Sequence, residues 1–191
     1  DHQRLMEKIL LAAKEFTLAD AGTLYLKTDQ NTLRFEILRN DTLNIALGGT
    51  TGNPVDLPDV EMYDEDGSPN LNNVVSAAAF TGNLINVDDA YESNKFDFSG
   101  TKTFDKSIGY KSTSFLTVPL KDHEGDVIGV MQLLNAKEPE TGEVVPFKEE
   151  IQQLIQALAS QAALSLNNQL LMRAQRELLN AFIEFYMYLK G

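Results

Sequence analysis

The side chains that could do chemistry in this chain are limited first by what is missing. The sequence holds no cysteine and only two histidines, His2 and His123. Without Cys, disulfides, thiolate metal sites, thiol nucleophiles and thioether-linked cofactors are all excluded. His123 falls in a predicted turn, and no Ser-His-Asp set, metal-ligand spacing or phosphate-binding glycine motif stands out. These patterns favour binding over catalysis, and an enzyme is the weakest interpretation.

The remaining candidates gather between residues 72 and 111, where aromatic rings are interspersed with polar groups. Ligand pockets combine such rings with a few directed hydrogen-bonding groups. We expect a small molecule to contact both kinds of side chain: the rings of Phe80, Phe96, Phe98 and Tyr110, and the polar groups of Ser76, Asn94, Lys95, Asp97, Thr103 and Asp105. Alternatively, the rings pack in the core, and Thr103 and Asp105 serve a helix start. Backbone N–H groups at the start of a helix predicted over 103–108 could hold an anion.

Charge and hydropathy narrow the class of partner. The formal net charge is −12, which disfavours nucleic acid because phosphate binding requires a basic surface. Ten Asp or Glu and one Lys lie between Pro54 and Ser99, which indicates a solvated acidic loop, with a cation site or a basic partner as alternatives. No apolar run approaches the roughly 18 residues that span a bilayer, and the first residues do not form a secretory signal. With no cysteine, a cytoplasmic location is expected.

Periodicity predicts the elements that position these residues. Leu5, Ile9, Ala12 and Phe16 recur at helical spacing and predict a helix over residues 1–17. Alternating apolar residues predict a hairpin of strands at 24–26 and 33–37, and a third short strand at 43–47. A loop over 54–70, a helix at 72–80 that ends at Gly82, a strand at 84–87 and the helix at 103–108 follow.

Two later strands, 112–120 and 127–135, carry apolar residues on both faces. Such strands lie inside a sheet that is covered on both sides. The terminal helices must form one cover, and the region of residues 70–110 must form the other. The ligand pocket is therefore expected on the face away from the terminal helices.

The last helix begins near Phe147 and contains no Gly or Pro before Gly191. Its first half can pack on the sheet. Beyond it, Leu164, Leu171, Leu178 and Phe185 recur every seven residues, which is typical of a coiled coil. We expect a homodimer, with parallel helices favoured, through this helix and the N-terminal one, where Leu5 and Ile9 join the interface. A helix that folds back on its own domain is the alternative.

Three segments carry a family resemblance: GYKSTSFLTVPL at 109–120, GDVIGVMQLLN at 125–135 and ASQAA at 159–163. They resemble GAF domains, and most of all those of cyclic-nucleotide phosphodiesterases, bacterial adenylyl cyclases and related bacterial signalling proteins. The resemblance implies an α+β fold, with a central antiparallel sheet, N- and C-terminal helices on one face, and pocket loops and short helices on the other. It divides the chain into a GAF domain at 1–170, which includes the N-terminal helix 1–17, and a helical extension at 171–191 that leads to an output domain.

The resemblance also implies a regulatory function without catalysis in this domain. Such a domain of a bacterial signalling protein binds a small molecule, such as a cyclic nucleotide, and transmits its ligand state through dimeric terminal helices. The output domain in the same polypeptide would be a cyclase, phosphodiesterase or kinase. The signature of the cyclic-nucleotide subset is incomplete here: Asn135 and Phe147 match it, whereas Ala136 replaces its Lys, and Ile151 and Gln152 replace its Asp-Glu. A dimerisation scaffold without a ligand is therefore the alternative. Without cysteine, the methionine sulfoxide reduction and covalent bilin attachment of other GAF branches are excluded.

Overall fold

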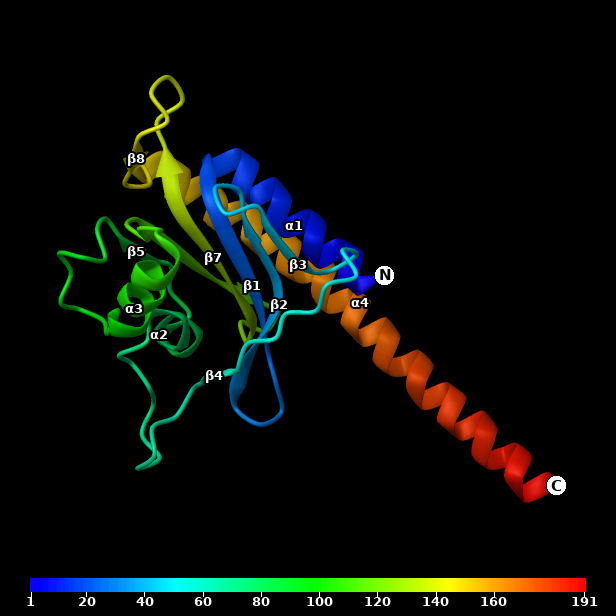
Figure 1. Ribbon diagram of the computed structural model, residues 1–191. Coiled ribbons are helices and arrows are strands. Elements are labelled where there is room, and N and C mark those ends of the chain that lie inside the picture. The colour runs from blue at the N-terminus through cyan, green and yellow to red at the C-terminus, as the bar shows by residue number, and fades with distance from the viewer.

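The computed structural model describes residues 1–191 and contains one antiparallel sheet between two layers of helices (Figure 1). The strand order is β3-β2-β1-β7-β6-β5, with β4 paired to β2 and β8 paired to β7. The strands are β1 Ala19–Lys27, β2 Thr32–Asn40, β3 Ile45–Gly48, β4 Val60–Glu61, β5 Ile85–Val87, β6 Phe115–Lys121, β7 Val127–Lys137 and β8 Val144–Val145. The helices are α1 His2–Thr17, α2 Val74–Thr81, α3 Ser99–Ile108 and α4 Glu149–Lys190.

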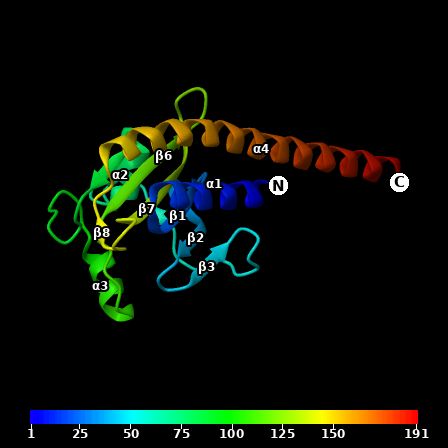
Figure 2. The same cartoon turned by 90° about the horizontal axis from the view of Figure 1, so that it is seen from above.

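Both faces of the sheet are covered, as predicted. Helices α1 and α4 lie on one face, and α2, α3 and their loops lie on the other (Figures 1 and 2). A cluster of 18 buried residues, among them Leu24 and Leu133, fills the helix side. A separate cluster of 12, among them Tyr25 and Val130, fills the other side. The predicted α+β class and the placement of the terminal helices on one face are confirmed.

A bulge in the central hairpin changes which residues of β2 face the pocket side. Tyr25 pairs with Phe35, but Leu24 pairs with Ile37, so the register shifts between them. Because a bulge breaks the two-residue alternation, Phe35 contacts the pocket-side cluster whereas Ile37 is buried on the helix side. The predicted alternation of Leu33, Phe35 and Ile37 on one face is therefore wrong for Ile37.

Helix α1 begins at Asp1, whose carboxylate accepts a hydrogen bond from the Gln3 N–H at 2.9 Å. Its buried stripe is Met6, Leu10 and Ala13, one residue on from the predicted stripe. The difference arises because α1 rests on both the sheet and α4. The predicted residues Ile9, Ala12 and Phe16 line the groove between the two helices instead.

Helix α1 comes close to the sheet at Gly22. A Cβ atom at Gly22 would lie 2.8 Å from a methyl carbon of Leu10, so the absence of a side chain allows this close packing.

Helix α4 begins at Glu149 and runs for 42 residues, which corresponds to about 63 Å. Its first half buries Ile155, Ala159, Ala163 and Leu166 against the sheet. Its second half leaves the domain as a free rod (Figures 1 and 2). The alternative in which this helix folds back on its own domain is therefore wrong. No helix has both the length and the apolar character needed to cross a membrane.

Two helices on the pocket side have different starts from those predicted. Helix α2 is capped by Asn73, not Asn72, and ends at Gly82 as expected. Helix α3 begins at Ser99, four residues earlier than predicted, because the Asp97 carboxylate accepts a hydrogen bond from the Ser99 N–H at 2.9 Å. The two-residue strands β4 and β8 are too short to leave a periodic signal and were not predicted.

Candidate functional site

A cavity of about 340 Å³ lies on the sheet face opposite α1 and α4, between the β2–β3 edge and α3. This volume lies at the lower end of the range for small-molecule pockets. Strands β1 and β7 form its floor, and β2, β3, α3 and the residues before β6 form its walls. Its lining is Ala21, Gly22, Thr23, Phe35, Leu38, Arg39, Asn40, Leu43, Ile45, Leu57, Gly100, Thr101, Phe104, Tyr110, Ser112, Phe115, Gln132 and Leu134.

The lining is mostly apolar and contains four aromatic rings, those of Phe35, Phe104, Tyr110 and Phe115. On the floor, the Gln132 side-chain amide donates to the Thr117 hydroxyl at 3.1 Å, which leaves the amide oxygen of Gln132 available to a ligand. No Lys, Asp or Glu belongs to the lining. The cavity therefore suits a small molecule with apolar surface and a few hydrogen-bonding groups.

The one charged residue in the lining, Arg39, has its guanidinium engaged elsewhere. Its Nη2 donates to Glu7 Oε2 at 2.7 Å, and its Nη1 donates to the Leu47 carbonyl oxygen at 2.7 Å. Glu7 belongs to α1, on the far face of the sheet. Arg39 therefore joins the pocket wall to α1 and does not present a free cation to the cavity.

The first turn of α3 opens on the cavity through Gly100 and Thr101. Asp97 satisfies the N–H of Ser99, but the N–H groups of Gly100 and Thr101 find no acceptor in the protein. Unsatisfied N–H groups and the helix dipole favour an anion at such a position. The helix start at which the sequence suggested an anion begins at Ser99, not at Thr103.

A polar network lies beneath the Tyr110 wall of the cavity. The Tyr110 hydroxyl donates to Asp20 Oδ2 at 2.6 Å and accepts from the Asn135 amide at 2.9 Å, while Lys137 forms an ion pair with Asp20. Burial acts to raise the pKa of Asp20, but hydrogen bonds from Lys137, Tyr110 and Thr42 outweigh it and hold the pKa below its ordinary value. Burial and the hydrogen bond to Asp20 raise the pKa of Tyr110, so its hydroxyl stays protonated and able to donate.

Asn135 shapes the segment that leads into β6. It has φ of 59°, a left-handed conformation that Asn adopts more readily than most residues. Its side-chain oxygen accepts from the N–H groups of Thr113 at 2.8 Å and Ser114 at 3.2 Å, and its amide donates to the Lys111 carbonyl at 2.8 Å. Asn135 therefore fixes the 110–114 wall without lining the cavity.

Asp105 ties α3 to the same wall. Its buried carboxylate accepts from the Tyr91 hydroxyl, the Ser112 N–H and the Ser112 hydroxyl, each at 2.7 Å. No cation pairs with it, so these three donors compensate for the burial of the charge. In this structure Asp105 holds α3 against the wall of the cavity. Its carboxylate oxygens therefore have little capacity left for a ligand.

The structure brings few of the predicted ligand residues together. Of the ten, Tyr110 lines the cavity. Phe98 does not line it but packs on the lining residue Phe115, with ring centroids 5.1 Å apart. Phe96 contacts Phe98 from outside, at 6.3 Å between centroids. The other predicted residues lie away from the cavity.

Helix α2 carries two of them. Ser76 is fully buried, and its hydroxyl lacks a hydrogen-bond partner, while Phe80 packs edge-on against Tyr63 at 5.1 Å between ring centroids. Four more are exposed on or before α3: Asn94, Lys95, Asp97 and Thr103.

The largest group of lining residues that the sequence did not reveal comes from the β2–β3 edge. Because of the bulge, Phe35 and Leu38 both lie on the pocket face of the sheet, and Leu43 and Ile45 continue the wall of the cavity. The available signal was the mostly apolar segment from Leu43 to Leu47, which contains part of the edge strand β3. That run alone does not distinguish the wall of a cavity from an ordinary core.

The residues predicted for a dimer interface fall into two groups. On α4, Leu164, Leu171, Leu178 and Phe185 are 37–73 % exposed. On α1, Leu5 and Ile9 are partly buried against the helix-side core. The α4 residues are thus free for a partner, whereas the α1 residues contribute in part to their own domain.

Comparisons with known proteins fit this architecture. Residues 1–166 match the sequence profile of the GAF domain. The chain is similar to a cGMP-specific 3',5'-cyclic phosphodiesterase of Drosophila sechellia, 26 % identical over 137 residues that cover 69 % of this chain and 10 % of that protein. It thus spans about a tenth of the length of that relative.

Two solved structures share the fold. The GAF-B domain of DevS from Mycobacterium smegmatis superposes with a TM-score of 0.58 at 16 % identity, covering 93 % of this chain and 99 % of that one. A type II free methionine-R-sulfoxide reductase from Thermoplasma acidophilum superposes with a TM-score of 0.53 at 16 % identity, covering 85 % and 93 %. At these identities the likeness concerns the fold alone.

Proposed function

The chain belongs to the GAF domain family, and we propose that it is a regulatory domain that senses a small molecule for an output domain in the same polypeptide. The cavity of about 340 Å³ on the face away from the terminal helices carries this proposal. The family is a regulatory domain type, and the chain offers no cysteine for the chemistry of a thiol-dependent reductase. We place this function in the cytoplasm of a bacterium, with residues 1–170 as the sensor and 171–191 as the helical extension.

Cyclic nucleotides are the first ligand class to test. The similarity to a cGMP-specific phosphodiesterase supports this choice, and so do the rings that could stack on a base. The free N–H groups of Gly100 and Thr101 are placed to donate hydrogen bonds to a phosphate oxygen. The Gln132 amide oxygen on the floor could accept a hydrogen bond from a base amino group.

A ligand in this cavity would act on α1 through the β2–β3 wall. Glu7 of α1 accepts from Arg39, and also from the Thr50 N–H at 2.9 Å and the Thr50 hydroxyl at 2.6 Å. Lys14 of α1 forms an ion pair with Asp41 at 2.6 Å. Binding would shift the β2–β3 wall, and these hydrogen bonds and the ion pair would then shift α1 relative to α4. The populations of two arrangements of the helices would change as a result.

We propose that two copies associate through α4, with α1 alongside. The exposed seven-residue repeat of Leu171, Leu178 and Phe185 supports this arrangement. Changing both Leu171 and Leu178 to Asp should leave a folded chain with the mass of one copy in light scattering. A wild-type chain that is already monomeric at high concentration would contradict the dimer.

The binding proposal is tested by thermal denaturation with cyclic AMP and cyclic GMP, and then with amino acids, oxyacids and haem. A ligand at a hundred times its Kd should stabilise the fold by about 2.7 kcal/mol. Leu134→Phe, which fills part of the cavity, should abolish this stabilisation, whereas Lys121→Gln, at the other end of β6 from the cavity, should keep it. If no compound raises the melting temperature of the wild-type chain, the sensor proposal fails.

The second candidate is a dimerisation module without a ligand. The replacement of the signature Lys and Asp-Glu by Ala136, Ile151 and Gln152 favours it. Such a module would form the same dimer, and no ligand of the series would raise its melting temperature.

Signal transmission can be measured separately with spin labels near Leu178. Because the chain has no cysteine, Asn180→Cys on the polar face of α4 gives one label per copy. Ligand should change the distance distribution between the two labels. An identical distribution with and without a bound ligand would remove the transmission mechanism.

A further inference from the structure

The floor of the cavity consists of two rows of side chains that cross the sheet at neighbouring positions. One row is apolar and consists of Ala21, Leu134 and Phe115. The other row is polar and consists of Thr23, Gln132 and Thr117. Strand β7 lies between β1 and β6 in the middle of the sheet (Figure 1), so Gln132 occupies the centre of the polar row.

Most polar side chains of the cavity lining already have partners in the protein. Four of them are engaged in hydrogen bonds: Arg39, Asn40, Tyr110 and Ser112. Thr23 and Thr101 each offer a single hydroxyl. The Gln132 amide donates one of its two N–H groups to Thr117 and keeps its oxygen and its second N–H. Gln132 is therefore the side chain of the lining that can offer an acceptor and a donor on neighbouring atoms.

The Gln132 amide can be reversed without losing its bond to Thr117. Thr117 is fully buried, and its hydroxyl accepts from Gln132 Nε2 at 3.1 Å but has no acceptor for its own hydrogen. If the amide rotates by half a turn, its oxygen takes the place of its nitrogen and accepts a hydrogen bond from that hydroxyl. Each orientation contains one hydrogen bond between the two residues, so we expect their free energies to be similar.

The two orientations present opposite patterns of hydrogen-bonding groups to the cavity. The edge of an amide carries an acceptor beside a donor, and rotation exchanges their places. A Gln side chain can therefore pair through two hydrogen bonds with a base edge such as that of adenine. Hypoxanthine and guanine carry a donor and an acceptor in the reverse order on their Watson–Crick edge. A reversible amide can match either order.

We propose that Gln132 is the specificity-determining residue of the cavity, and that the cavity takes heterocycles whose edge carries a donor beside an acceptor, in either order. Thr117 is a positioning residue, because its hydroxyl holds the amide in both orientations. The apolar row of Leu134 and Phe115 beside Gln132 would contact the face of the ring. The inference rests on the proposed sensing of a small molecule and names the class of that molecule.

The first test uses the wild-type chain and three probes in titration calorimetry: cyclic AMP, cyclic GMP and cyclic inosine monophosphate. The edges of adenine and hypoxanthine are reversed copies of each other. We expect the Kd values of cyclic AMP and cyclic inosine monophosphate to agree within about fivefold, because a fixed amide would discriminate between them by more than that.

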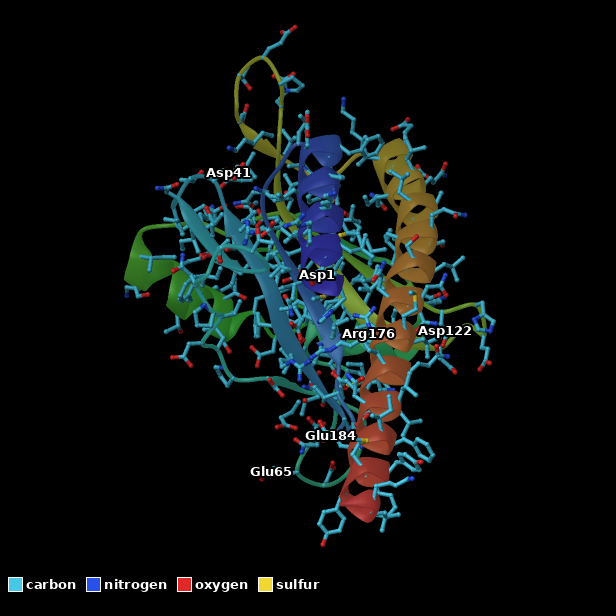
Figure 3. All side chains as sticks on the ribbon, turned by 90° about the vertical axis from the view of Figure 1, so that its right-hand side faces the viewer. Asp1, Asp41, Glu65, Asp122, Arg176 and Glu184 are labelled. Atoms are coloured by element: carbon cyan, nitrogen blue, oxygen red, sulfur yellow. The ribbon has the colours of Figure 1, made fainter.

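The second test makes the amide irreversible. Gln132→Glu keeps the size of the side chain but offers two acceptors, which suit the two neighbouring donors of guanine and oppose the ring acceptor of adenine. The preference for cyclic GMP over cyclic AMP should therefore rise by about tenfold. Gln153→Glu is the matched control, because it adds the same charge to an exposed position of α4, which Figure 3 shows on the helix side of the sheet. It should leave the preference unchanged.

The third test separates the hydroxyl of Thr117 from its packing. Thr117→Val keeps the shape of the side chain and removes the hydroxyl, so it should weaken all three probes by about fivefold. Thr117→Ser keeps the hydroxyl and should retain the affinity of the wild type. A role in packing alone predicts the opposite order, because Ser leaves a hole in the core that Val does not.

The outcomes distinguish this inference from the proposed function. If cyclic AMP and cyclic inosine monophosphate differ by more than about fivefold in the wild type, the amide does not reverse and the inference is wrong. The same nucleotide preference in Gln132→Glu and Gln153→Glu would also overturn it, while the sensor proposal would stand. If no nucleotide binds but another compound raises the melting temperature, only the ligand class is wrong. If nothing binds, both proposals fail. The wild-type comparison decides the reversal even if Gln132→Glu does not fold.

Discussion

The two faces of the sheet are built on different physical principles. The helix face is a continuous apolar core of 18 buried residues between the strands, α1 and α4. The pocket face has 12 buried residues with a cavity beside them, and hydrogen bonds of Asp105, Asn135 and Tyr110 fix its walls. Apolar packing stabilises the helix face, where the remaining space is a groove between α1 and α4, whereas hydrogen bonds hold a cavity open on the pocket face. The first face therefore supplies stability, and the second can accommodate a ligand.

The largest expected effect comes from two neighbouring leucines of β7. Leu133 is fully buried on the helix side, and Leu134 is half-buried on the floor of the cavity. Leu133→Ala should cost about 2–5 kcal/mol of unfolding free energy, because it leaves a hole in a close-packed core. Leu134→Ala should cost about 1 kcal/mol, since its side chain already borders empty space. Urea denaturation of both variants gives the comparison.

This pair is its own control, because the same atoms are removed from adjacent positions. Equal losses of unfolding free energy would contradict the difference between the faces. A loss at Leu134 larger than that at Leu133 would mean that the pocket side holds the principal core.

The second largest effect should come from Asp105→Asn. An amide keeps the shape of the carboxylate but turns a donor toward one of the three groups that donate to it. Loss of charge-assisted hydrogen bonds in a buried site should cost about 2 kcal/mol. Asp97→Asn is the matched control, because Asp97 is exposed and an Asn side-chain oxygen can accept the same hydrogen bond from the Ser99 N–H. Equal urea midpoints for the two variants would show that α3 does not depend on Asp105.

The helix face of the sheet could be predicted from the sequence more completely than the pocket face. Strands with apolar residues on both sides required two covers, and Gly82 and Gly109 marked where α2 and α3 end. Such signals are local or periodic, so they can be recognised without coordinates. The α+β sheet and the side of the pocket could therefore be predicted.

The lining of the cavity could not be predicted for three physical reasons. The bulge in β2 places Phe35 and Leu38, three residues apart, on the same side, which simple alternation excludes. The donors to Asp105 come from Tyr91 and Ser112, which only the tertiary fold brings to it. An apolar residue such as Ile45 also has the same pattern whether it faces a cavity or a core.

The third prediction concerns the hydroxyl that joins the cavity wall to the sheet. Tyr110→Phe removes the donor to Asp20 and the acceptor of the Asn135 amide, and should cost about 1 kcal/mol of unfolding free energy. Tyr188→Phe is the control, because the Tyr188 side chain is 80 % exposed on α4 and makes no hydrogen bond. If the two variants unfold at the same urea concentration, the network beneath the wall contributes no stability.

The smallest effect belongs to the joint between the two faces, where Glu7 of α1 holds Arg39 and Thr50. Hydrogen bonds from Thr50 and the nearby Arg39 lower the pKa of Glu7 below its ordinary value of 4.5. As pH falls below 4.5, the unfolded chain takes up this proton before the folded one, so stability present at neutral pH is lost toward acid. Glu7→Gln should therefore cost at most about 1 kcal/mol at pH 7 and progressively less below pH 4.5. Urea midpoints of the wild type and Glu7→Gln, measured across this pH range, should converge at low pH. Glu15→Gln, on the exposed side of α1, is the control. A gap between wild type and Glu7→Gln that stays constant down to pH 3 would mean that shape, and not the ion pair, joins α1 to the pocket wall.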